Sequence, residues 1–88
     1  MTTPIVIDAS AGVEIVTSTG RGRRLAQLVP AAAELWVPEH FYSEVFASIR
    51  YLHVVARKLT VQRAEAAIER LTRWHLRQVG LVSLIRPA

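Results

Sequence analysis

Three short apolar runs alternate along the chain with longer segments whose apolar residues recur every three or four positions. The runs at 4–7, 34–38 and 81–85 predict buried strands, because each is short and is bounded by Pro, Asp or Gly. Helical patterns fill the segments between these runs. The order strand, helices, strand, helices, strand predicts an α/β fold with a three-stranded parallel sheet and right-handed crossover helices.

Two short helices are predicted between the first two strands. Ser10 can accept a hydrogen bond from a free backbone N–H and so cap a helix over residues 11–16. Segment 18–22 contains two glycines and predicts a turn. Apolar positions from Arg23 onward predict a second helix, which ends or kinks at Pro30.

The segment after the second strand has the clearest helical pattern in the chain. Its apolar stripe comprises Phe41, Val45, Ile49, Leu52 and Val55. A second helix follows, with Thr60 as its predicted N-cap and with Glu69 and Arg73 as a surface ion pair. Its predicted apolar face comprises Val61, Ala64, Ile68, Leu71 and His75. The two helices are expected to form a hairpin.

Composition narrows the class of protein. The 88 residues suffice for one domain, and 51% hydrophobic with 20% charged residues argues against disorder. The chain has no Cys, which excludes disulfides, thiolate zinc sites and cysteine nucleophiles. No apolar run is long enough to cross a bilayer, and residues 1–10 do not resemble a signal peptide. We therefore expect a cytoplasmic protein without a membrane partner.

The charge is unevenly distributed. Residues 1–44 carry five acids and three bases, a net charge of −2, whereas residues 45–88 carry two acids and eight bases, a net charge of +6. Basic side chains attract phosphate, and Arg does so with a planar fork, which is consistent with a nucleic-acid partner. The abundance of Arg and Ala is equally consistent with compositional bias.

Two acidic residues are candidates for chemistry. Asp8 is the sole Asp of the chain and stands where the first strand ends, the edge at which ligands bind in open α/β sheets. Glu44 lies on the strongest helix among apolar neighbours, where a carboxylate is costly unless it is paired or bound to a cation. The simpler interpretations are that Asp8 caps the following helix and that Glu44 is a solvated residue at the edge of the stripe.

Together these motifs resemble PIN-domain nucleases, and most closely the VapC toxins of toxin–antitoxin pairs. The residues Ile5-Val6-Ile7-Asp8-Ala9-Ser10 are similar to the family's first strand and its hhhDxS motif. Trp36-Val37-Pro38, followed by Glu44-Val45, is similar to the second strand and the helix-borne Glu. Arg57-Lys58-Leu59-Thr60 falls where the family's next helical hairpin turns. The resemblance covers the whole chain.

The resemblance implies an endoribonuclease that depends on Mg²⁺ or Mn²⁺, with Asp8 and Glu44 as metal-binding and catalytic residues. Hard divalent cations prefer carboxylate oxygens and can activate water at neutral pH. Ser10 would orient Asp8 through a hydrogen bond. Arg21, Arg23 and Arg24 flank Gly22 near this site and suit contacts with RNA phosphates, although a solvated start of a helix explains them equally well. The family also implies a cognate antitoxin and a homodimer.

The sequence departs from the family in one respect. PIN nucleases draw further acids from the part of the domain after the third strand, whereas here only Glu65 and Glu69 follow Glu44. Two carboxylates hold Mg²⁺ weakly, because water fills most of the ion's coordination shell. We therefore expect residues 1–88 to be the N-terminal portion of a single PIN domain, incomplete at its C-terminus and inactive by itself as a nuclease.

Three other interpretations are open. The chain could be a noncatalytic interaction module that dimerises or binds an antitoxin. It could be a phosphatase of the haloacid dehalogenase type with Asp8 as nucleophile, although that family usually has a second Asp where Ser10 stands. His40 precedes Glu44 by four residues, so the two could share a transition metal, but a surface histidine is the simpler interpretation. His53 and His75 are predicted to be structural, and the aromatic residues to pack in the core.

Overall fold

The computed structural model describes residues 4–79 and contains a parallel sheet, four α-helices and one π-helical segment. The elements in chain order are β1 (Pro4–Val6), α1 (Ala9–Val16), α2 (Gly20–Leu28), β2 (Glu34–Pro38), α3 (Phe41–Arg50), η1 (Tyr51–Val55, the π-helix), α4 (Val61–Arg73) and β3 (Arg77–Val79). Strand β2 lies between β1 and β3, and both pairings are parallel. The predicted α/β fold with crossover helices is confirmed.

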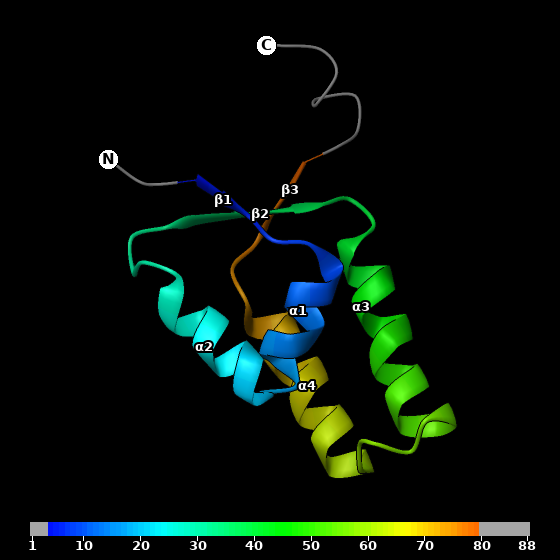
Figure 1. Cartoon of the computed structure of the whole chain (residues 1–88). Helices are drawn as coiled ribbons and strands as arrows, with labels where there is room; N and C mark the ends of the chain where they lie inside the picture. Colours follow the sequence, from blue (N-terminus) through cyan, green and yellow to red (C-terminus); the bar gives the residue numbers. More distant parts are fainter. Residues whose placement is uncertain (1–3, 80–88) are drawn as a thin grey trace.

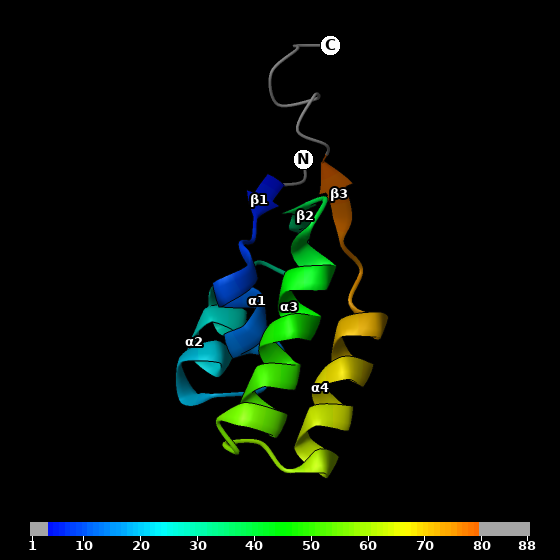
Figure 2. The ribbon, with the colours of Figure 1, turned by 90° about the vertical axis from the view of Figure 1, so that its right-hand side faces the viewer.

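Buried and exposed side chains alternate along the strands, so the sheet has one face toward the helices and one face away from them. Ile7 and Val37 are buried against the helices, whereas Val6 is 70% exposed on the opposite face. The four α-helices lie below the strands in both Figure 1 and Figure 2, so the described helices cover one side of the sheet. On the other side the Arg77 guanidinium lies 5.7 Å from the centroid of the Trp36 ring and 3.3 Å from Glu34 Oε1.

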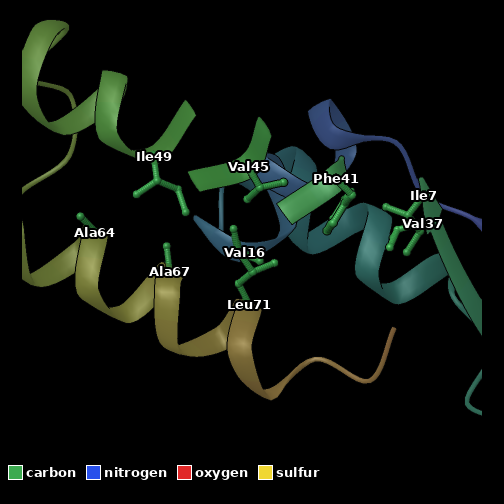
Figure 3. Packing of buried hydrophobic residues seen from close by; sticks show 9 residues of the cluster. All are labelled: Ile7, Val16, Val37, Phe41, Val45, Ile49, Ala64, Ala67 and Leu71. Atoms are coloured by element: carbon green, nitrogen blue, oxygen red, sulfur yellow. The ribbon is translucent and has the colours of Figure 1, made fainter. Parts of the chain in front are cut away.

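A single hydrophobic core joins the helices to the sheet (Figure 3). Its buried members are Ile7, Val16, Val37, Phe41, Val45, Ile49, Ala64, Ala67 and Leu71. Phe41 is fully buried near the centre, where its ring meets Trp74 edge to face with 6.3 Å between centroids. The first half of the predicted stripe on α3 is therefore confirmed.

The second half of that stripe was predicted wrongly. Leu52 is only half-buried and Val55 is 65% exposed. The cause is η1, because a π-helical segment has a longer repeat than the 3.6 residues on which the stripe depends. On α4 the buried face comprises Ala64, Ala67 and Leu71, whereas the predicted core residue Ile68 is 37% exposed.

The remaining differences concern the ends of elements. Helix α1 is capped by Asp8 and not by Ser10, which lies inside its first turn. Helix α2 begins at Gly20 within the predicted turn, because the Thr19 hydroxyl accepts a hydrogen bond from Gly22 N. His75 follows the end of α4 and is exposed. The third described strand is β3, and the predicted strand at 81–85 lies outside the described residues.

Gly22 is required for packing. A Cβ atom at this position would lie 1.8 Å from the carbonyl oxygen of Glu14 in α1, so the two helix backbones can approach this closely only at glycine. The Thr19 hydroxyl also donates a short hydrogen bond to the Glu14 carboxylate. These contacts hold the start of α2 against α1.

Candidate metal site

The sheet topology brings the two predicted acids to one edge. Asp8 follows β1, and Glu44 lies in the first turn of α3, directly after β2. Because β1 and β2 are adjacent and parallel, their carboxyl ends lie at the same edge of the sheet. The helices that follow also pack closely, since a Cβ on Gly12 of α1 would lie 2.5 Å from the Phe41 ring of α3.

Asp8 is exposed and has a defined geometry. Its Oδ1 accepts hydrogen bonds from Ala11 N at 2.8 Å and from Ser10 Oγ at 3.0 Å. The backbone hydrogen bond from Ala11, the Ser10 hydroxyl and the positive charge of Arg21 lower the pKa of Asp8 below its usual 3.8. No group in residues 4–79 donates a hydrogen bond to Oδ2. Asp8 is therefore ionised at neutral pH with one oxygen available to a ligand.

Glu44 is solvated. Its side chain is 54% exposed, and Oε1 lies 3.3 Å from His40 Nε2, one helical turn earlier. The expectation that its apolar neighbours would enclose the carboxylate is wrong, because Val45 faces the core while Glu44 points away from it. A side chain with this exposure is hydrated by solvent and needs no buried partner.

The local geometry of both acids agrees with the simpler interpretations of the sequence, a helix cap for Asp8 and a solvated residue for Glu44. Asp8 caps α1, and Glu44 lies at the edge of the apolar stripe. Neither role prevents binding of a cation, since the cap uses only one of the two Asp8 oxygens. The hydrogen bonds and ion pairs of the two acids have no member in common. Among residues 4–79, no three or more acidic or histidine side chains gather where they could hold a metal ion.

Asp8 also borders an apolar cavity between β1, α1 and α2. The cavity has a volume of about 260 Å³ and is lined by Ile5, Val6, Ile7, Asp8, Ala11, Ile15, Leu25, Leu28 and Val29. Leu28 and Val6 are 77% and 70% exposed, so the apolar lining extends to the surface of the molecule.

The three arginines predicted to contact phosphate have different environments. Arg21 is close enough to Asp8 for its charge to lower the carboxyl pKa. Arg23 donates a hydrogen bond from Nη1 to the Ser18 carbonyl at 2.6 Å, which ties it to the loop between α1 and α2. Arg24 is exposed on α2. Of the three, Arg21 is associated most directly with the candidate site.

Sequence reasoning missed a basic cluster at the connection between α3 and α4. Its members, referred to below as the hairpin-tip cations, are Arg50, Arg57, Lys58 and Arg63, and all four are exposed. The signal was present in the sequence, because no Asp or Glu occurs between Glu44 and Glu65. His53 has the structural role predicted for it, since its Nδ1 lies 2.9 Å from the Leu59 carbonyl oxygen.

No protein-family model, curated protein or solved structure matches the chain. Within the described part of the chain, none of the helices has the length and apolar character needed to span a membrane.

Proposed function

We propose that the chain contributes to an endoribonuclease of the PIN type that depends on Mg²⁺ or Mn²⁺, and that it acts as the toxin of a toxin–antitoxin pair. The observation that supports this proposal best is the placement of Asp8 and Glu44 at the carboxyl edge of adjacent parallel strands. The motif resemblance supplies the reaction class, the hydrolysis of RNA phosphodiester bonds.

The donor atoms at this edge suit a hard divalent cation. Asp8 is ionised and has Oδ2 available, and Glu44 contributes a second solvated carboxylate. A bound Mg²⁺ or Mn²⁺ would supply charge neutralisation at the phosphate and activation of water. Two carboxylates make up a minority of the ion's ligands, so water would fill most of the remaining coordination positions.

The chain's own residues would prepare the site before any ion binds. Ser10 holds the Asp8 carboxylate through Oδ1 and leaves Oδ2 without a hydrogen bond from the described residues. The Arg21 guanidinium, near Asp8 at the start of α2, would bind a phosphate oxygen of the RNA beside the scissile bond. Single-stranded or looped RNA is the proposed substrate class, because its backbone is accessible at an open edge.

A thermal unfolding series with Mn²⁺ tests the metal site. An ion that binds the folded state raises the Tm, so millimolar Mn²⁺ is expected to stabilise the wild-type chain. Asp8→Asn and Glu44→Gln should each abolish most of this increase. Asn is as good an N-cap as Asp, so Asp8→Asn removes the charge and preserves the cap.

Glu69→Gln is the matched control for Glu44→Gln. Glu69 and Glu44 are both exposed helical residues paired with a base four residues away, Arg73 and His40 respectively. Glu69→Gln should retain the full increase in Tm with Mn²⁺. If the Asp8→Asn and the Glu44→Gln variants each retained the Mn²⁺-dependent increase in Tm, the metal site would be contradicted. Any RNA cleavage detected should likewise stop in those two variants and continue in Glu69→Gln.

The apolar cavity beside β1 favours an interaction function alongside the nuclease. Strand β1 lies at an edge of the sheet formed by residues 4–79, and the adjoining cavity is apolar with the Asp8 carboxylate at its border. An extended antitoxin segment could pair with the edge strand, place apolar side chains near Leu28 and set a basic residue beside Asp8. Such binding would inhibit the proposed nuclease by occupying the carboxyl edge.

A further inference from the structure

The hairpin-tip cations form an uncompensated positive surface. Arg50, Arg57, Lys58 and Arg63 are exposed, and none of them forms an ion pair within the described residues. The basic residues that follow are engaged: Arg70 donates to the Val16 carbonyl, Arg73 pairs with Glu69, and Arg77 pairs with Glu34. Among the described residues after Glu44, the bases that form no ion pair or side-chain hydrogen bond therefore lie at the α3–α4 connection, whereas Arg21 and Arg24 on α2 are further exposed bases without an ion pair.

This surface lies at the end of the molecule farthest from the sheet, in both Figure 1 and Figure 2. It contains a groove of about 520 Å³ lined by His53, Val54, Arg57, Lys58, Leu59 and Thr60. The groove thus presents two adjacent cations, Arg57 and Lys58. Tyr51, at the start of η1, is 58% exposed but lines a separate pocket together with Ser10 and Val13 of α1.

The backbone around the groove is held by several hydrogen bonds. Ala56 N donates to the Tyr51 carbonyl at 2.9 Å, and Lys58 N and Leu59 N donate to the Leu52 carbonyl at 2.8 and 3.2 Å. Arg57 has a φ of 52°, in the left-handed region that favours glycine. The two adjacent cations are therefore presented on an ordered loop, and one of them occupies a position where its backbone conformation is unfavourable.

We propose that the hairpin tip binds the phosphate backbone of single-stranded RNA, with Arg57 and Lys58 contacting phosphates in the groove. Guanidinium and ammonium groups bind phosphate oxygens through charge-assisted hydrogen bonds. The choice of RNA over other polyanions rests on the proposed function. The helical rise of α3 and η1 from Glu44 to Val55 is about 16 Å, so an RNA that reaches both the carboxyl edge and the hairpin tip must extend several nucleotides beyond the cleaved bond.

Fluorescence anisotropy of a labelled oligouridine, measured with the 88-residue chain in EDTA, tests this proposal. Arg57→Gly removes one cation and places glycine where the left-handed backbone favours it, so its Tm should not fall. Its affinity should fall about five- to tenfold at low salt, and the slope of log K against log salt should become shallower by about 0.7. Loss of binding in a chain of undiminished stability cannot come from unfolding.

Two control variants match this experiment. Ser18→Gly changes the other described residue with a positive φ, 56°, and leaves the charge unchanged, so it should bind oligouridine like the wild type. Lys58→Gln and Arg73→Gln each remove one positive charge, but only Lys58→Gln should weaken binding. Equal losses in these two variants would indicate a response to net charge alone and would overturn the proposal.

Two further results would overturn the assignment: wild-type affinity in both Arg57→Gly and Lys58→Gln, or binding to phosphatidylserine vesicles without binding to oligouridine. Because EDTA removes divalent ions, this measurement does not require a bound metal. Arg57→Gly, which should lose oligouridine affinity, should keep the full Mn²⁺-dependent increase in Tm, because Arg57 lies at the opposite end of the molecule from the metal site. Failure of the tip and failure of the metal site are thus distinguishable.

Discussion

At the scale of single residues, Asp8 combines two roles in one side chain. Its Oδ1 caps α1 by accepting from Ala11 N and also receives the Ser10 hydroxyl, whereas Oδ2 is free of hydrogen bonds from the described residues. A cap of this kind favours the ionised form, which is also the form that binds a cation. The structural and the proposed chemical role of Asp8 therefore require the same protonation state.

This coupling predicts a pH dependence of stability. The pKa of Asp8 is lower in the folded chain than its usual 3.8, so the stabilisation is fully present above that value and is lost as the pH falls through the folded-state pKa. Asp8→Asn cannot lose a charge, so the difference in unfolding free energy between wild type and variant should shrink from pH 6 to pH 2. Urea denaturation at several pH values measures it. A difference that is constant across this range would contradict the interpretation of the cap.

At the scale of elements, the close packing of α1 and α2 depends on one glycine. Gly22→Ala is expected to destabilise the chain by about 3 kcal/mol, because the added Cβ overlaps the Glu14 carbonyl and only a backbone shift can relieve the overlap. Gly20→Ala is the control on the same helix, since its Cβ would be 3.6 Å from the nearest atom. It should stabilise the chain by about 0.5 kcal/mol. Equal effects of the two substitutions in chemical denaturation would contradict the close approach.

The sequence predicts correctly those element ends that depend only on residues close by in the chain. The second strand has the bounds predicted for it, Glu34–Pro38, and Thr60 caps α4 as expected. Both depend on neighbouring residues: a proline that closes the strand and a hydroxyl that meets a free N–H. The turn predicted at 18–22 is confirmed at Ser18 but wrong from Gly20 onward, where α2 begins, because glycine signals a turn and a close helix contact equally well. Only the packing of α2 against α1 separates these two possibilities.

The π-helical segment and β3 were missed for a similar reason. The spacing of apolar residues in Tyr51–Val55 does not indicate a longer helical repeat. The carbonyl groups of η1 accept hydrogen bonds from the following loop, such as the bond from Lys58 N to the Leu52 carbonyl. Strand β3 has only three residues, and it takes its conformation by pairing with β2. Interactions between distant segments determine both features.

In the molecule as a whole, the candidate metal site and the proposed RNA-binding surface lie at opposite ends. The acids lie at the carboxyl edge of the sheet, and the hairpin-tip cations lie at the far end of the α3–α4 hairpin. The sequence predicts the edge to which Asp8 and Glu44 belong, because that follows from strand order. It does not predict the distance between their oxygens, which depends on helix tilt and side-chain conformation. The metal proposal therefore requires a direct measurement of the two acids together.

The proposed nuclease requires Asp8 and Glu44 to bind one divalent ion jointly. Addition of Mn²⁺ to the ¹⁵N-labelled chain tests this requirement, because a paramagnetic ion broadens the amide signals of nearby residues. A shared ion should broaden the signals at the starts of both α1 and α3 at the same Mn²⁺ concentration, and the broadening should be lost at both places in Asp8→Asn or in Glu44→Gln. Broadening near only one acid, or loss near Glu44 alone in Glu44→Gln, would show that the two carboxylates do not share an ion.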